Sequence, residues 1–541
     1  MEILKKLKIN KIIFYISLLL MSFMFSITKN GADLDLWHRM AVGKIFSQLG
    51  TVVYHDIFTY FPSKPVWVDH EWLSGVIFYN LGHFFGDYGI LFLKVSILFS
   101  ILVLIYKTNQ LIYPEPDKQR ISWSFITLLS VLIGISATLR CQVFTYLFFT
   151  LWIYVLERVR RGENRLIWIF PATTLLWANM HAGFVAGFGL IIFYAVGEFL
   201  NNLFGCSLQD DETAPKRNPL KYLAILALCL PVTLINPYGI KYWYYLIEAL
   251  TMHRPYITEW EWLNPFKSFY KVLGTKIQVL LLIPSLIYIT FSKKIASRYK
   301  KIDWVEIIAF LVTLYLGIKH LRHVVFFSII VAVFGYKYFV IFTDAVFSKI
   351  KEKFYALIPE NKHALANFTK FVIIYSFIIN ACILIISGTP HEINLSFYPT
   401  KAVEFIKINK LKGNLLVPFN WGSYAMWKLY PQNLISIDGR YEETYKNEAY
   451  MDICTITFFS NKKYLKQWEQ AFNKYHHDIF LINKNSAAQE KFKKLKDWKA
   501  VYEDKQAVVF IRSSIPDKKW LQPNKDEKYY IKTKYENNIN F

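Results

Sequence analysis

Apolar stretches of about twenty residues recur through the first 390 residues of this 541-residue chain, and they limit the fold more than any other feature. A helical stretch of that length matches the hydrocarbon thickness of a bilayer. Hydrophobic residues make up 54% of the chain and charged residues 19%, so apolar runs alternate with charged patches. We therefore predict a multi-pass α-helical membrane protein of about eleven spans. The predicted spans are 11–28, 88–107, 121–139, 142–157, 166–180, 182–199, 220–235, 276–291, 303–318, 322–341 and 369–388.

The placement of Lys and Arg predicts how these spans are oriented. Four lysines stand before or at the start of the first span and no small-residue cleavage site follows it, so we expect a retained span with a cytoplasmic amino terminus. The basic segments 157–165, 216–221, 292–301 and 348–370 then also face the cytoplasm. With this orientation, an odd number of crossings must follow the first outer loop. We therefore predict an amphipathic helix at the outer surface over 71–85 and a span over 88–107.

The formal net charge of +23 also restricts the partners of the chain. Basic residues beside spans mark topology and attract anionic lipid. Because they are scattered among apolar runs, they do not form the single basic face that nucleic-acid binding requires. The five cysteines show no CxxC spacing, so neither a disulfide framework nor a zinc site is indicated. We expect a lipid bilayer as a partner and no nucleic acid.

The first outer loop, residues 29–87, carries a dense group of carboxylates and imidazoles directly after the first span. In an extended segment, Asp33 and Asp35 would point the same way. Such a pair can hold a divalent metal (Mg or Mn), or it can divide into a general base and its partner. A solvated connecting loop is the alternative interpretation. The supporting candidates in this loop are His38, Arg39, His70 and Glu71.

Arginines at outer helix ends are suited to a lipid-linked phosphate, because a guanidinium forms paired hydrogen bonds with it. Arg140 and Arg322 stand at such ends, and we expect Lys319 and His323 to add positive charge. The alternative for each arginine is snorkelling to lipid head groups. His181 falls on the same outer side; a capped helix end with a satisfied imidazole is its alternative.

The composition changes after residue 389, and no further span follows. Short apolar strands alternate with helical patterns over 390–515, which predicts an extracytoplasmic α/β domain after the membrane domain 1–389. The strands are expected at 414–418, 433–437, 478–482, 500–503 and 506–511. Trp421, Asp438 and Arg440 lie near strand ends, where such domains bind ligands, although turn chemistry is the alternative. Residues 516–541 are polar, and we expect them to be poorly ordered.

Several motifs in this order resemble those of the GT-C superfamily of membrane glycosyltransferases, in particular a group of bacterial GT-C-like membrane proteins. The superfamily includes protein O-mannosyltransferases, aminoarabinose transferases and the oligosaccharyltransferase catalytic subunit. The matching segments are DLDLWH at 33–38, PVWVDHEWL at 65–73, QVFTYLFF at 142–149, WANMHAGF at 177–184, INPYG at 235–239, LRHVVFF at 321–327, WGSY at 421–424 and IDGR at 437–440. A second acidic motif of the metal-dependent oligosaccharyltransferases is missing, which leaves metal dependence open.

The resemblance implies an inverting glycosyltransferase of the bacterial inner membrane that serves cell-envelope glycan biosynthesis. A polyprenyl-phosphate sugar would be the donor, and a glycan, lipid or protein the acceptor, at the extracytoplasmic face. In the family, an aspartate of the first outer loop acts as the base. Here this is Asp33 or Asp35, and the step from Asp33 to Arg39 favours Asp33. A lipid-linked glycan flippase and a non-catalytic envelope assembly protein are the rival hypotheses.

Overall fold

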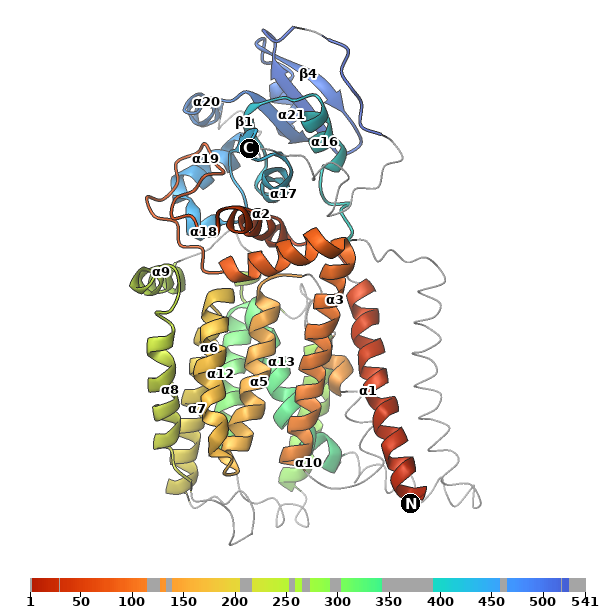
Figure 1. Ribbon diagram of the computed structural model, residues 1–541, viewed down its shortest axis with the longest axis vertical. Coiled ribbons are helices and arrows are strands. Elements are labelled where there is room, and N and C mark those ends of the chain that lie inside the picture. The colour runs from red at the N-terminus through yellow and green to blue at the C-terminus, as the bar shows by residue number, and fades with distance from the viewer. Residues whose placement is uncertain are drawn as a thin grey trace.

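The structure is a computed structural model, and it describes residues 2–28, 30–113, 127–132, 139–204, 217–252, 258–264, 273–291, 303–342, 393–457, 465–516 and 518–524. Upright helices form a bundle, a layer of helices crosses its upper end, and an α/β domain lies above that layer (Figure 1). The predicted span 369–388 and most of 121–139 lie outside the described residues.

The bundle reproduces the predicted apolar helices that fall on described residues. Two helical segments, Trp72–Ile112 and Phe184–Leu203, are long and apolar enough to cross a membrane, and the bent pair Leu321–Phe334 and Tyr336–Phe342 would make a third. No other single helix among the described residues combines the length and the apolar character of a span, so the count of about eleven spans stays a prediction. The helices are α1 (Glu2–Thr28), α3 (Trp72–Ile112), α5 (Gln142–Arg160), α6 (Ile169–Met180), α7 (Phe184–Leu203), α8 (Leu220–Val232), α10 (Leu273–Phe291), α12 (Trp304–Lys319) and α13 (Val324–Phe334).

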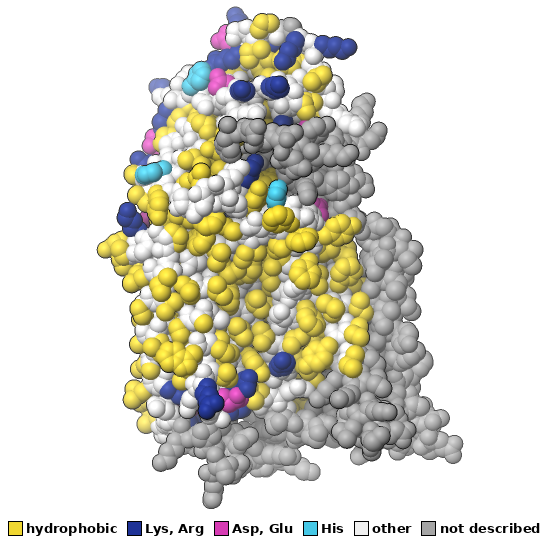
Figure 2. Space-filling model, viewed as in Figure 1, with side chains coloured by type: hydrophobic (Ala, Val, Ile, Leu, Met, Phe, Trp, Pro, Cys, Tyr) yellow, Lys and Arg dark blue, Asp and Glu magenta, His cyan; other side chains and the backbone are white. Residues whose placement is uncertain are grey.

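The surface of the bundle is apolar on the face that Figure 2 shows. Hydrophobic side chains cover the length of the bundle there, whereas charged side chains gather at its lower rim and over the α/β domain (Figure 2). Large side chains such as Phe92, Leu311 and Tyr315 are at least 60% exposed on bundle helices. A soluble protein rarely exposes so large an apolar area, so this belt suits a bilayer.

Helix α3 changes direction at Gly86, whose φ of 59° and ψ of −144° are not helical. The part before Gly86 lies across the top of the bundle and the part after it runs down through the bundle (Figure 1). Sequence patterning predicted the same division into a surface helix over 71–85 and a span over 88–107. Helix α9 (Ile240–Thr251) also lies across the upper end of the bundle (Figure 1).

The first outer loop contains a helix that we did not predict, α2 (Leu34–Leu49). Asp33 is its N-cap, and Gly50 ends it with a φ of 70°. Trp37 points inward from α2 and packs edge-on against Tyr398 and Tyr424 of the carboxyl-terminal domain. Asp33 itself is extended, but the extended or irregular segment considered for 33–35 is wrong from Leu34 onward, because the capping aspartate and the apolar face favour a helix.

The carboxyl-terminal domain has a five-stranded mixed sheet in the order β2-β1-β3-β5-β4, which confirms the predicted α/β class. Strands β2, β1 and β3 run parallel, and β5 pairs antiparallel with β3 and β4. The elements are α16 (Thr400–Ile408), β1 (Gly413–Leu416), α17 (Phe419–Leu429), β2 (Asn433–Ile435), α18 (Tyr441–Thr444), α19 (Asn447–Thr457), α20 (Leu465–Asn473), β3 (Ile479–Asn483), α21 (Ala487–Phe492), β4 (Trp498–Glu503) and β5 (Ala507–Arg512).

Two contacts extend this domain beyond its predicted limits. In the first outer loop, Thr59 forms a parallel bridge with Ile435 of β2, so the loop adds to the edge of the sheet. After the predicted boundary at 515, the backbone of Leu521 exchanges two hydrogen bonds with the side chain of Asn409. The expected disorder from about 515 is therefore wrong for residues 518–521, whereas 525–541 lie outside the described residues.

Candidate active site

The two aspartates and the first arginine predicted for the site meet at the upper end of the bundle. Asp33 Oδ1 accepts a hydrogen bond of 3.1 Å from the backbone N–H of Asp35, as an N-cap does. Arg140, just before α5, places Nε 2.9 Å from Asp33 Oδ2 and 3.9 Å from Asp35 Oδ2. Two aspartates near the start of the chain and a distant guanidinium are thus in contact, while their catalytic and phosphate-binding roles stay predictions.

A third carboxylate joins this group. Glu259 lies in the short 3-10 helix η2 (Thr258–Trp260), and Nη1 of Arg140 donates to both of its oxygens, at 2.6 and 2.8 Å. The exposed fractions of the side chains are 13% for Asp33, 31% for Asp35, 19% for Arg140 and 34% for Glu259. The group is therefore open to solvent on one side, as a site that admits a substrate must be.

The second basic group contacts the same short helix, η2, at Trp260. The guanidinium of Arg322 stacks 4.8 Å from the ring centre of Trp260, and Nδ1 of His320 lies 2.8 Å from the Trp260 carbonyl oxygen. His323 also packs edge-on against this ring, at 6.0 Å. Lys319 ends α12 as an exposed residue. Helix η2 thus contacts both basic groups: Glu259 pairs with Arg140, and Trp260 packs against Arg322 and His323.

The electrostatic environment gives Asp35 an unusual proton affinity. Loss of solvation and then the neighbouring Asp33 carboxylate raise the pKa of Asp35 well above its ordinary value, although Arg140 acts in the opposite direction. The carboxylates around Arg140 raise the pKa of its guanidinium, which stays charged. A carboxylate with a raised pKa beside a fixed positive charge can accept a proton from a substrate hydroxyl.

A buried ionic cluster lies one helical turn further along α2. Arg39 contacts Asp69, and its Nε and Nη2 lie 2.6 Å from Glu71 and 2.5 Å from Glu443, respectively. The Arg39 side chain is 2% exposed. Glu443 belongs to the carboxyl-terminal domain, so the cluster ties that domain to the first outer loop. Arg39 and Glu71 thus form an ion pair with each other, and neither side chain is directed at Asp35.

His70 sits between two carboxylates of this cluster. Its Nδ1 lies 3.1 Å from Glu443 and its Nε2 lies 3.4 Å from Glu71. Burial alone would lower the pKa of His70, but Glu443 and Glu71 raise it to about 10. The ligand atoms of these three residues lie within 4.8 Å of one another, as a metal site would require. Both ring nitrogens face carboxylate oxygens, however, so an imidazolium already supplies the positive charge.

His181 links the cluster to the bundle. Its Nδ1 accepts the backbone N–H of Gly183 at 2.7 Å and lies 2.9 Å from the Thr145 hydroxyl. Because Nδ1 accepts from Gly183, it carries no hydrogen, so any hydrogen bond with Thr145 has the hydroxyl as its donor. The proton of the neutral ring is therefore on Nε2, which lies 3.3 Å from Glu71. His181 therefore orients Glu71. Both of its ring nitrogens have partners, which agrees with the alternative interpretation of a satisfied imidazole.

The three candidates of the carboxyl-terminal domain make internal contacts. Arg440 donates to Asp438 and, at 2.6 Å, to Asp56 of the first outer loop, and all three side chains are fully buried. Trp421 is 4% exposed and donates to the carbonyl oxygen of Phe397. These side chains hold the domain against the loop, so the predicted ligand contacts of Trp421, Asp438 and Arg440 have no support in the geometry.

The loop after β2 brings Gly439 of the same domain against the first turn of α2. The hydroxyl of Ser423 on α17 accepts the backbone N–H of Gly439 at 3.1 Å and lies 3.4 Å from Nδ1 of His38. A Cβ at Gly439 would lie 3.2 Å from Asp35 Oδ1. The carboxyl-terminal domain therefore touches the candidate base directly.

We expect Gly422→Ala to destabilise this contact between α17 and the loop after β2. A Cβ at Gly422 would lie 1.8 Å from the backbone oxygen of Ile437. The backbone of α17 or of the loop after β2 would have to move to remove this clash. Overpacking of this kind costs about 1–3 kcal/mol or more. Thermal unfolding of the purified protein measures the cost. Gly189→Ala, whose Cβ would meet nothing within 4 Å, is the matched control and should leave the melting temperature unchanged or raised.

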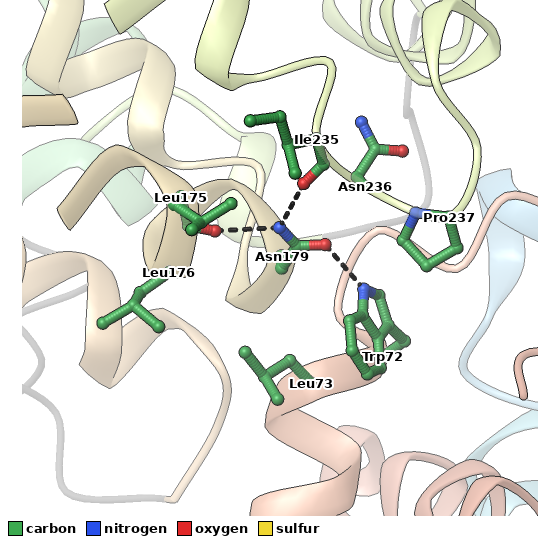
Figure 3. A pocket seen from close by; sticks show the side chains of 8 residues that line it. All are labelled: Trp72, Leu73, Leu175, Leu176, Asn179, Ile235, Asn236 and Pro237. Atoms are coloured by element: carbon green, nitrogen blue, oxygen red, sulfur yellow. Dashed lines mark hydrogen bonds between the residues drawn. The ribbon is translucent and has the colours of Figure 1, made fainter. Parts of the chain in front are cut away.

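A separate apolar hollow of about 410 Å³ opens beside the start of α3. Its side chains come from α3, α6 and the segment before α9, and Asn179 receives a hydrogen bond from Trp72 and donates to Leu175 and Ile235 (Figure 3). None of the predicted catalytic or phosphate-binding residues lines it. The side-chain amide of Asn179 already has protein partners for its hydrogen bonds. The group at Asp35 and Arg140 is therefore the better candidate for a catalytic site.

The sequence places Glu259 on the predicted outer face, and Ser423 and Gly439 stand within the WGSY and IDGR motifs, but it predicts no role for these three residues and does not indicate Glu443. The EWEW run at 259–262 was visible as an interface segment, and IDGR was visible as a strand end. Glu443 follows that motif within YEET and carries no pattern of its own. Only the packing of the two domains reveals its contact with Arg39.

Neither a protein-family profile nor the sequence of any curated protein matches this chain. Solved structures do match. The oligosaccharyltransferase of Archaeoglobus fulgidus in its apo form aligns with a TM-score of 0.52 at 11% identity, over 87% of this chain and 69% of that chain. The same enzyme, AglB, in complex with an inhibitory peptide and a dolichol-phosphate aligns at 0.51 and 11% identity, with the same coverage.

The mycobacterial arabinofuranosyltransferase AftD aligns with a TM-score of 0.50 at 11% identity, over 93% of this chain and 40% of that longer chain. These neighbours are GT-C glycosyltransferases and membrane proteins. At this identity the likeness concerns the fold, and it confirms the resemblance that the motifs indicated. The chain has the fold of the GT-C membrane glycosyltransferases.

Proposed function

We propose that this chain is an inverting membrane glycosyltransferase that moves a sugar from a polyprenyl-phosphate carrier to an acceptor. One observation carries the proposal: Asp33, Asp35 and Arg140 meet at a partly exposed site of a chain with the GT-C fold. The AglB neighbour was solved with a dolichol-phosphate, which is chemically the same class of carrier. The reaction would take place at the extracytoplasmic face of a bacterial inner membrane, with the amino terminus in the cytoplasm.

Asp35 is the better candidate for the base. One oxygen of Asp33 caps α2, and the other pairs with Arg140 at 2.9 Å, so Asp33 is occupied by structural contacts. Asp35 is more exposed and has the raised pKa. This reverses the preference for Asp33 taken from spacing. Asp35 would remove the proton of the acceptor hydroxyl as that oxygen attacks the anomeric carbon from the face opposite the phosphate.

Arg322, with Lys319 and His323, would stabilise the negative charge that grows on the leaving phosphate. Arg140 was also predicted for this role, but it is already paired with Asp33 and Glu259. Three carboxylates surround Arg140, so this group has a formal net charge of −2. An anion would therefore be repelled close to Asp33. We therefore place the phosphate at Arg322 and the basic turn, beside Trp260, and the acceptor hydroxyl at Asp35.

A divalent metal, Mg or Mn, at Asp33 and Asp35 stays a prediction, and the side chains fit it poorly. Arg140 already lies against both carboxylates. Among the described residues, the one group of three ligand atoms within reach of an ion is at His70, Glu71 and Glu443. No step of the proposed reaction depends on a metal.

The pH dependence of transfer is expected to follow the protonation of Asp35. Asp35 must be ionised to act as a base, so kcat/KM should fall when acidification protonates it. Because its pKa is raised, this fall should occur at a pH above the ordinary aspartate pKa of about 3.9. Asp33→Asn removes a like charge and should shift this acid limb to lower pH. A pH profile of kcat/KM for both proteins checks this. A limb that stays in place in Asp33→Asn, or moves upward, contradicts the assignment.

The rival hypotheses differ in measurable ways. A lipid-linked glycan flippase would move the intact carrier and leave the sugar bond unbroken, and an assembly protein would tolerate changes at Asp35. The test is transfer of ¹⁴C-labelled sugar out of a polyprenyl-phosphate glycolipid fraction by the purified protein. Loss of label from the carrier, dependent on Asp35, supports the transferase. Unchanged carrier in the presence of folded protein and acceptor extract contradicts it.

A further inference from the structure

Gly439 lies where the carboxyl-terminal domain meets the first turn of α2, and a side chain at this position would be tightly packed. A Cβ at this position would lie 3.2 Å from three polar atoms, Asp35 Oδ1, His38 Nδ1 and Ser423 Oγ. Its φ is outside the left-handed region that glycine alone favours. The backbone would accept alanine, so the constraint comes from the close approach to Asp35.

The loop that carries Gly439 is held on both sides. Arg440 binds Asp438 and Asp56 in a fully buried group, and the Tyr445 hydroxyl donates to Asp438 at 3.0 Å. Within the loop, Gly439 N–H donates to Ser423. A loop with so many fixed contacts cannot yield easily to an added methyl group.

His38 joins Ser423 to the helix that carries Asp35. Because the Ser423 oxygen accepts from Gly439, its own hydrogen is available for Nδ1 of His38, 3.4 Å away. His38 is 1% exposed, and burial lowers its pKa to about 3, so the ring is neutral and can accept this hydrogen. Asp35 and His38 are three residues apart and share one face of α2.

We propose that His38, Ser423 and Gly439 are positioning residues that hold the Asp35 carboxylate against the carboxyl-terminal domain. The domain then forms one wall of the catalytic site and excludes water there. The acceptor must approach Asp35 from the opposite side, past Arg140 and Glu259. The catalytic consequence rests on the proposed function, but the contact itself can be measured without activity.

Gly439→Ala tests this contact in the full-length protein in detergent. The methyl group must displace Asp35, His38 or Ser423 by a few tenths of an ångström, so hydrogen exchange of residues 34–40 should rise severalfold. For transfer from the labelled glycolipid fraction, kcat should fall by roughly 3- to 30-fold with KM for the glycolipid unchanged, because misplacing a reacting group lowers the rate of the chemical step. Gly189→Ala, on α7, is the matched control and should change neither quantity.

Ser423→Ala is the second variant, and it adds no bulk. It removes the acceptor of Gly439 N–H and should loosen residues 34–40 even if Gly439→Ala does not fold. The proposal is overturned if hydrogen exchange of residues 34–40 is the same in both variants as in the wild type. It is also overturned if the wild type is active and kcat is unchanged in both variants. If exchange rises while the wild type transfers no sugar, the contact stands and the proposed function fails.

Discussion

Asp35→Asn is expected to lower kcat/KM for sugar transfer by about 100- to 10,000-fold, the usual contribution of a general base. Asparagine has nearly the same shape, so the helix and its contacts with Gly439 are retained while the proton acceptor is lost. The measurement is transfer from the labelled glycolipid fraction, with protein amount and membrane insertion matched to wild type.

Asp33→Asn is the matched control for this change. Asparagine caps a helix as well as aspartate does, so α2 should persist. Its loss of activity should be smaller, because Asp33 acts through Arg140 and the cap. Full activity of Asp35→Asn, or a larger loss in Asp33→Asn, would contradict the assignment of Asp35 as the base.

Arg39→Met is expected to destabilise the protein by about 3–5 kcal/mol, the usual cost of removing one partner of a buried ion pair. Without the guanidinium, Asp69, Glu71 and Glu443 would remain buried beside one another, and the two domains would lose their common cation. Unfolding of the purified protein by heat or denaturant measures this change.

Arg158→Met supplies the control. Arg158 pairs with Glu163, but the two side chains are 33% and 43% exposed, and surface pairs contribute about 0–1 kcal/mol. Glu443→Gln should make the loss of Arg39 less costly, because one buried negative charge is then absent. Equal stability of Arg39→Met and Arg158→Met would show that the buried cluster does not join the domains.

The fold could be predicted from the sequence where local patterns decide it. The length of apolar runs predicts the bundle helices, and the alternation after residue 389 predicts the five strands near their observed positions. The helix α2 was also predictable in principle, since Asp33 and Gly50 are ordinary capping residues. It was missed because a loop rich in charge was taken to be irregular.

The site could be predicted only in part. Topology alone brought Asp33, Asp35 and Arg140 to one side of the membrane, and the structure joins them. The predicted topology could not reveal that Arg39 and Glu71 bind each other, or that Glu443 completes their cluster. Those contacts depend on how the sheet edge of β2 packs against the first outer loop, and no periodicity in the sequence records that packing.

A cryo-EM structure of the protein with a bound polyprenyl-phosphate sugar tests the central claim most directly. We expect the phosphate to contact the guanidinium of Arg322, with the anomeric carbon on the side of the Asp35 carboxylate. A phosphate bound elsewhere in the molecule, with the sugar out of reach of both Asp33 and Asp35, would contradict the account.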